Sequence, residues 1–166
     1  MNEKEIRALW ESEFIMCNVK ELLELKRRIK ELEAQLALPK LKPAGTIDIN
    51  LFSSILLDKL DEIGDNNAEL YLADKNSKIF DKETVMDFLG LNETDKIVYV
   101  PEEMDCDDFA AELFGKGVPL VWTVLHALSW FIDTQGEFYF IEPQTDKISK
   151  NLEGWQGSDI RFFLSR

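Results

Sequence analysis

Cys106, His126 and Glu142 are the residues whose types and order fit nucleophilic catalysis. Cys106 falls in the first turn of a helix predicted over residues 105–115, where unpaired backbone amides and the helix dipole favour a thiolate. His126 and Glu142 lie in or at the end of strongly apolar runs, LVWTVLHALSWFI and FYFIE, so each polar side chain needs a partner. A thiol, an imidazole and a carboxylate are the nucleophile, base and orienting group of a cysteine hydrolase.

The predicted hairpin brings His126 and Glu142 close together. Opposed residues of an antiparallel hairpin have a constant sum of positions, and this pair centres the hairpin on Thr134, inside the turn predicted at residues 133–136. We therefore expect direct cross-strand neighbours, or diagonal neighbours after a two-residue slip. A carboxylate that holds one imidazole nitrogen leaves the other free to face a thiol.

Gln144 and an acidic cluster flank these residues. Gln144 lies two residues beyond Glu142, on the same side if the strand continues, and its amide could donate to a developing oxyanion. A surface glutamine in the PQT turn is the alternative. Asp105, Asp107 and Asp108 surround Cys106, and their negative charge raises the pKa of a neighbouring thiol. Their other role is to cap the helix and to complement its dipole.

Composition excludes several classes of protein. The 166 residues carry a net charge of −13, with one histidine and two cysteines, Cys17 and Cys106, which are too few for a zinc site or a disulfide scaffold. Residues 46–166 have a charge of −14 and residues 1–45 a charge of +1, so we expect no nucleic-acid partner. The sequence has neither a signal-peptide pattern nor an apolar run of ~18 residues. We therefore expect that the protein has no membrane span and that it is cytoplasmic or virion-associated.

Residues 1–38 are predicted to form a coiled-coil helix. Its seam alternates steps of three and four, and oppositely charged residues occupy the flanking positions, which favours a parallel homo-oligomer. The seam consists of Leu22, Leu25, Ile29, Leu32 and Leu36, and the charge pairs are Glu21 with Lys26 and Arg28 with Glu33. Because the seam is clean for only two heptads, an intramolecular hairpin or docking onto the domain stays open. Pro39 and Pro43 end the helix, and residues 39–45 are predicted to be a linker.

Residues 46–166 are predicted to form one α+β domain, with helices first and an antiparallel sheet after them. The predicted helices run from residue 48 or 50 to about 63, over 81–90 and over 105–115. The predicted strands are a small hairpin at 70–72 and 78–80, a short strand at 97–100, two long strands at 120–132 and 137–141, and a last strand at 160–164.

Three short motifs, DCDDFA at 105–110, HAL at 126–128 and IEPQ at 141–144, resemble the papain-like domain at the C-terminus of mushroom agglutinins and related phage- and prophage-encoded proteins. The resemblance covers roughly residues 46–166. It implies a thiol hydrolase with Cys106 as nucleophile, His126 as general base, Glu142 as orienting group and Gln144 beside the oxyanion.

The same resemblance implies calcium binding and dimers through this domain, with Asp105, Asp107 and Asp108 as weak candidate ligands. The sequence departs from the agglutinins in three ways: it lacks their carbohydrate-binding β-trefoil, its Cys-to-His interval is shorter, and no tryptophan stands just before Cys106. Lectin activity is therefore not implied.

These observations together predict a cysteine hydrolase that acts on a peptide or amide bond of a peptide or protein substrate. One alternative is a catalytically weak or inactive phage structural or accessory protein that keeps the fold and assembles through the coiled coil. Another is a cell-wall amidase or transglutaminase-like acyl transferase, which would use the same three residues on another acceptor.

Overall fold

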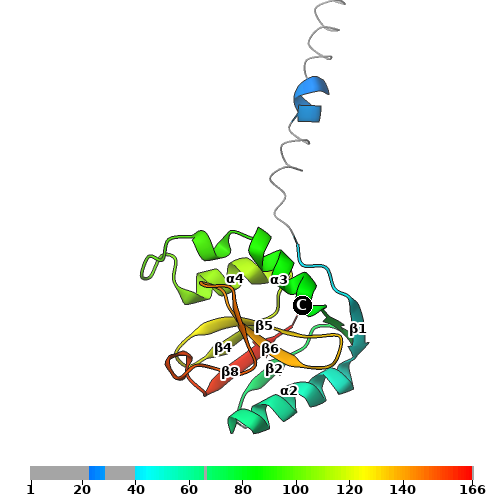
Figure 1. Ribbon diagram of the computed structural model, residues 1–166, viewed down its shortest axis with the longest axis vertical. Coiled ribbons are helices and arrows are strands. Elements are labelled where there is room, and N and C mark those ends of the chain that lie inside the picture. Colours follow the sequence, from blue (N-terminus) through cyan, green and yellow to red (C-terminus); the bar gives the residue numbers. More distant parts are fainter. Residues whose placement is uncertain (1–22, 29–39, 66, 166) are drawn as a thin grey trace, which may run out of the picture. The chain divides into compact units, whose positions relative to one another are not determined.

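The computed structural model describes residues 23–28, 40–65 and 67–165, and the chain divides into two units, Met1–Leu38 and Pro39–Arg166 (Figure 1). In the first unit, residues 23–28 are helical and exposed. The rest of the predicted seam lies outside the described residues, so the coiled coil and its self-association stay predictions.

The second unit is a mixed α+β structure, as predicted, and the papain-like form of this fold stays a prediction. Six strands form one sheet in the order β2-β8-β4-β5-β6-β7, and β1 pairs with β3 in a separate two-stranded sheet. The elements are β1 (Gly45–Asp48), α2 (Ile49–Ile63), β2 (Glu69–Tyr71), β3 (Asn76–Ile79), α3 (Lys82–Leu91), η1 (Thr94–Lys96), α4 (Cys106–Gly115), β4 (Leu120–Thr123), β5 (Ala127–Ile132), β6 (Phe138–Glu142), β7 (Lys147–Ser149), η2 (Gly154–Gln156) and β8 (Ile160–Leu164).

The large sheet is covered on both faces, which explains the near-continuous apolar character of its central strands. Helix α2 lies on one side of the sheet, and α3 and α4 lie on the other (Figure 1). Phe52 of α2 packs against Trp130 of β5, with ring centroids 5.5 Å apart. On the opposite face, Phe88 and Leu113 pack in a second core with Phe131. The two cores hold β5 and β6 rigidly in the middle of the domain.

The predicted helix starts are confirmed, because an aspartate caps each one. Asp48 accepts from the backbone N–H of Asn50 at 2.8 Å, and Asp81 accepts from that of Thr84 at 2.9 Å. Asp105 begins α4 in a capping box, in which its own backbone N–H donates to the Asp108 carboxylate at 3.1 Å. These caps satisfy backbone donors that a helix start leaves unpaired.

The predicted strand over residues 120–132 is wrong as a single strand. It consists of β4 and β5, which pair as an antiparallel hairpin with a turn between them. The Thr123 hydroxyl oxygen accepts from the backbone N–H groups of Leu125 and His126 at 3.1 and 2.9 Å. Because this side chain satisfies the turn amides, the chain reverses without glycine, asparagine or proline.

Two further strand predictions are wrong because pairing depends on distant segments. The expected hairpin of 70–72 with 78–80 does not form, since β2 pairs in parallel with β8 and β3 pairs with β1. Residues 97–100 have no strand beside them: only Val100 forms a bridge, to Met104, and Val98 is 76% exposed.

The segment predicted as a linker, 39–45, is packed against the domain where the structure describes it. Leu41 is 6% exposed, and its backbone N–H donates to the carbonyl of Lys116 at 3.0 Å. Gly45 already belongs to β1. In the part of the chain that the structure describes, no helix has both the length and the apolar character needed to cross a membrane.

Candidate active site

His126 and Glu142 form a buried hydrogen-bonded pair at one end of the sheet. The register of β5 and β6 opposes Ser129 to Ile141, which makes His126 and Glu142 diagonal neighbours, the arrangement expected after a two-residue slip. His126 Nε2 lies 2.8 Å from Glu142 Oε2, and the two residues are 6% and 4% exposed.

Gln156 also binds this pair, and it was not predicted from the sequence. Its Nε2 donates to Glu142 Oε2 at 2.8 Å, while its Oε1 accepts from the backbone N–H of Glu153 at 2.7 Å. Glu142 Oε2 therefore accepts two hydrogen bonds, one from Gln156 and one from His126. The proton in the second hydrogen bond is assigned to His126 Nε2. In the neutral ring, Nδ1 then carries a lone pair and can accept a proton.

A turn at residues 154–157 brings Trp155 onto His126 and Gln156 onto Glu142. The Trp155 ring packs against the imidazole edge-on, with centroids 4.8 Å apart, and covers it although Trp155 itself is 55% exposed. The Thr123 hydroxyl lies 2.5 Å from the carbonyl oxygen of Gln156, which ties this turn to the β4–β5 turn. Glycine at position 157 allows the 154–157 turn to lie close to Leu125, because a Cβ there would lie 3.3 Å from the Leu125 side chain.

The sequence held only a weak signal for this turn. The glycines at 154 and 157 mark a break in the chain, but the partner of Gln156 lies on another strand. Spacing along the chain does not reveal such a contact.

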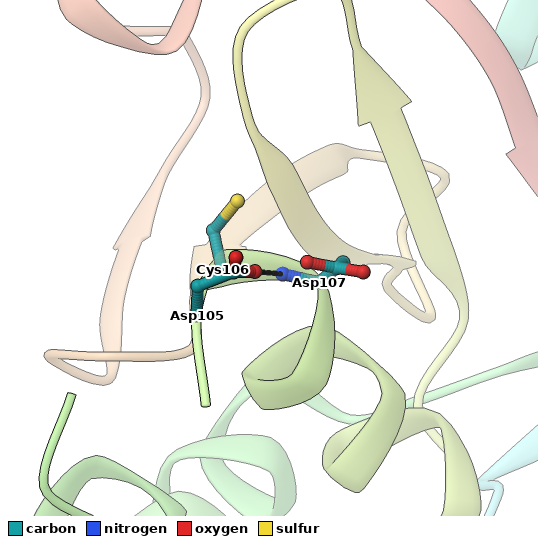
Figure 2. Close-up of side chains that lie close together, drawn as sticks. All are labelled: Asp105, Cys106 and Asp107. Carbon is teal, nitrogen blue, oxygen red and sulfur yellow. Dashed lines mark hydrogen bonds between the residues drawn. The ribbon is translucent and has the colours of Figure 1, made fainter. Parts of the chain in front are cut away.

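Cys106 is the first residue of α4 and is partly buried against the end of β5. Its side chain packs against the small cluster of Ala110, Leu120 and Ala127, and Ala127 directly follows His126. Figure 2 shows Cys106 at the helix start beside Asp105 and Asp107, with its sulfur pointing away from the two carboxylates. The structure thus places Cys106 against Ala127, the residue that follows His126 in the sequence.

The surroundings of Cys106 disfavour a thiolate on balance. Burial is the main cause that raises the pKa of the Cys106 thiol, and the negative charges of Asp105 and Asp107 raise it further. A backbone hydrogen bond from Ala127 acts in the opposite direction. A thiol in this position needs a base to take its proton as it attacks.

Asp105 and Asp107 interact with each other at the start of α4. A side-chain hydrogen bond between them lowers the pKa of Asp105 and raises that of Asp107. Their oxygens and the Cys106 sulfur lie within 4.8 Å of one another, while Asp108 is engaged in the capping box. Calcium takes six to eight oxygen ligands, of which Asp105 and Asp107 could supply only a part, so the calcium site implied by the resemblance stays a prediction.

Gln144 lies beyond strand β6, in the turn that was the alternative to a continued strand. Strand β6 ends at Glu142, and Gln144 is half-buried in the turn that follows. Its backbone N–H donates to Glu142 Oε1 at 3.4 Å. This contact supports the Glu142 carboxylate, and the oxyanion role of the Gln144 amide stays a prediction.

The domain shares its fold with a mushroom lectin of known structure. No protein-family model matches the sequence, and no curated protein matches it at a significant level. One similar structure is the PSL1a–E64 complex, with a TM-score of 0.60, 19% identity, and coverage of 72% of this chain and 50% of that one. Another is Polyporus squamosus lectin bound to Neu5Acα2-6Galβ1-4GlcNAc, a human-type influenza-binding epitope, with a TM-score of 0.58, 19% identity, and coverage of 72% and 49%.

The chain therefore spans about half the length of these lectin structures. At this level of identity the likeness establishes a common fold. It agrees with the mushroom agglutinin part of the resemblance found in the sequence.

Proposed function

We propose that the second unit is a papain-like cysteine hydrolase that cleaves a peptide or amide bond. The observation that carries the proposal is the 2.8 Å contact between His126 Nε2 and Glu142 Oε2. This contact leaves Nδ1 as the nitrogen available to Cys106, which packs against the residue after His126. The shared fold with a lectin solved in complex with E64 adds support, because E64 is an epoxide that alkylates thiols.

The mechanism begins with general-base catalysis. His126 Nδ1 takes the proton of the Cys106 thiol while the sulfur bonds to the substrate carbonyl carbon. The resulting imidazolium is stabilised by Glu142, and it gives its proton to the leaving nitrogen as the C–N bond breaks. His126 then deprotonates a water molecule that attacks the thioester carbon, the C–S bond breaks, and the sulfur recovers its proton.

The raised pKa of Cys106 shapes this mechanism. A thiol whose pKa lies above its ordinary value is mostly protonated at neutral pH, so proton transfer and attack have to be coupled. Reactivity then depends strongly on His126 and on the tautomer that Glu142 enforces. The reactivity of an ordinary exposed thiol would not depend on His126 or on its tautomer.

A second candidate is a catalytically inactive accessory protein that uses this fold for assembly. The acidic flank of Cys106 favours this candidate, because Asp105 and Asp107 oppose the thiolate that catalysis needs. In this case the buried pair of His126 and Glu142 serves only to satisfy polar groups at the end of the sheet.

Labelling with E64 distinguishes the two candidates. We expect peptide mapping by mass spectrometry to place one adduct on Cys106, with Cys17 as the internal reference thiol of the same chain. Cys106→Ala should abolish this adduct and any amide hydrolysis. Equal labelling of Cys106 and Cys17, or no Cys106 adduct, would support the accessory protein instead.

A further inference from the structure

Three aromatic side chains form a row across the face of the sheet that α4 partly covers. They are Trp122 of β4, Phe162 of β8 and Tyr71 of β2, which come from three adjacent strands. The ring centroids of Trp122 and Phe162 are 5.8 Å apart, and those of Phe162 and Tyr71 are 5.9 Å apart. Trp122 and Phe162 are half-buried, and Tyr71 is 51% exposed, so this aromatic row is accessible from solvent.

The aromatic row begins at the candidate nucleophile. Trp122 is the register partner of Ala127, and Cys106, Trp122 and Phe162 all pack against the same cluster that contains Ala127. At the other end, Tyr71 borders a shallow depression of about 380 Å³. The depression is also lined by Leu70, Leu72, Ala73 and Leu164. A chain bound at Cys106 could therefore lie along the aromatic row toward this apolar depression.

Carboxylates stand at both ends of the aromatic row. Asp105 and Asp107 flank Cys106 at one end, and Glu69 accepts a hydrogen bond from the Tyr71 hydroxyl at the other. Residues 46–166 carry a net charge of −14, which attracts cations over the whole domain. The faces of aromatic rings attract cations as well.

We propose that the aromatic row binds the substrate, and that the substrate is a cationic peptide segment with a large aromatic side chain next to basic residues. The aromatic side chain stacks on the row, and the basic residues lie against the carboxylates at its two ends. This inference rests on the proposed hydrolase function and specifies its substrate class. It also gives the acidic flank of Cys106 a role in binding.

Matched peptides test the inference in two measurements on the full chain. The first is kcat/KM of the wild type for three peptide amides that differ only in the central triplet, Lys-Phe-Lys, Lys-Ala-Lys and Glu-Phe-Glu. The second is calorimetric binding of the same peptides to Cys106→Ser, which needs no turnover. We expect Lys-Phe-Lys to exceed each of the other two by about tenfold or more in both measurements.

Two substitutions test whether the preference for phenylalanine over alanine arises from the aromatic row. Tyr71→Ala should reduce the preference for phenylalanine over alanine at least threefold, as judged from the ratio of the two kcat/KM values or of the two affinities. Tyr99→Ala is the matched control, because Tyr99 is equally exposed at 53% but lies outside the row, and this variant should keep the wild-type ratio.

The outcomes separate the inference from the proposed function. Hydrolysis of all three peptides at equal rates would overturn the substrate class and leave the hydrolase intact. Selective binding to Cys106→Ser without hydrolysis by the wild type would support the aromatic row and refute the hydrolase. An unchanged preference in Tyr71→Ala would overturn the assignment to the row.

Discussion

At the scale of single residues, Glu142 decides which imidazole nitrogen carries the proton. Its Oε2 accepts from His126 Nε2 and from Gln156 Nε2, each at 2.8 Å. A carboxylate in this position can only accept, so Nδ1 is left as the basic nitrogen. In the proposed mechanism, the reactivity of Cys106 therefore depends on Glu142, which acts on the thiol only through His126.

Glu142→Gln should disable the base while nearly preserving the shape of the side chain. A glutamine amide can donate to His126 Nε2, which moves the ring proton to Nδ1 and removes the lone pair that the proposed mechanism uses to deprotonate the thiol. We expect the rate of amide hydrolysis to fall about 10²–10⁴-fold. Glu83→Gln, at an exposed site on α3, should keep the wild-type rate. Full activity of Glu142→Gln would refute the tautomer argument.

Asp107→Asn should make Cys106 more reactive. Removal of one negative charge beside the sulfur lowers the pKa of the thiol and raises the thiolate fraction at neutral pH. We expect alkylation of Cys106 by iodoacetamide at pH 7 to accelerate about two- to fivefold, and Asp87→Asn on α3 to have no effect. A slower reaction in Asp107→Asn would show that Asp107 supports the thiol in some other way.

At the scale of secondary-structure elements, the 154–157 turn depends on one glycine. Gly157 has φ 80° and ψ 159°, a conformation that is essentially restricted to glycine, and a Cβ at this position would lie 3.3 Å from the Leu125 side chain. The turn sets Trp155 on the imidazole and Gln156 on Glu142. The 154–157 turn therefore positions these two side chains. Its hydrogen bond to Thr123 of the β4–β5 turn holds it in place.

Gly157→Ala should lower both stability and activity. We expect the free energy of unfolding to fall by about 1–3 kcal/mol, because alanine is strained at this backbone conformation and crowds Leu125. Gly90→Ala, inside α3 with no atom near its added Cβ, should raise stability by about 0.5–1 kcal/mol. Urea unfolding followed by circular dichroism measures both changes. Equal effects of the two substitutions would contradict this account of Gly157.

Local signals in the sequence predicted the elements that depend on neighbouring residues. The aspartate caps gave the starts of α2, α3 and α4, and the hairpin arithmetic gave the diagonal pair of His126 and Glu142. The β2–β8 pairing and the contact of Gln156 with Glu142 join segments that no local pattern connects. The Thr123 turn was hidden inside an apolar run, because a hydroxyl replaced the usual turn residues.

At the scale of the whole molecule, the partial burial of one carboxyl group of this acidic domain makes stability depend on pH. Asp146 lies in the turn between β6 and β7, and one of its oxygens is buried with no hydrogen-bond partner. Burial, and to a smaller extent the charge of Asp95, raises the pKa of Asp146 from 3.8 to about 6. The folded state therefore binds this proton more tightly than the unfolded state does, and the associated stability is lost as the pH rises through 6.

Asp146→Asn should remove this pH dependence. Asparagine tolerates the positive φ of 56° at this position and carries no charge. We expect the variant to exceed the wild type in stability by about 1 kcal/mol at pH 7.5, after allowance for solvent screening, and to equal it near pH 3.5. Urea unfolding across this range measures the difference, and a gap that widens toward low pH would contradict the prediction.

The central claim is that His126 acts as the base for Cys106, and the alkylation rate of Cys106 in the wild type and in His126→Ala tests it most directly. The measurement follows iodoacetamide modification of Cys106 at pH 7 by peptide mass, with Cys17 in the same chain as the reference thiol. We predict that His126→Ala slows modification of Cys106 about a hundredfold and leaves that of Cys17 unchanged. Equal Cys106 rates in the two proteins would contradict the account.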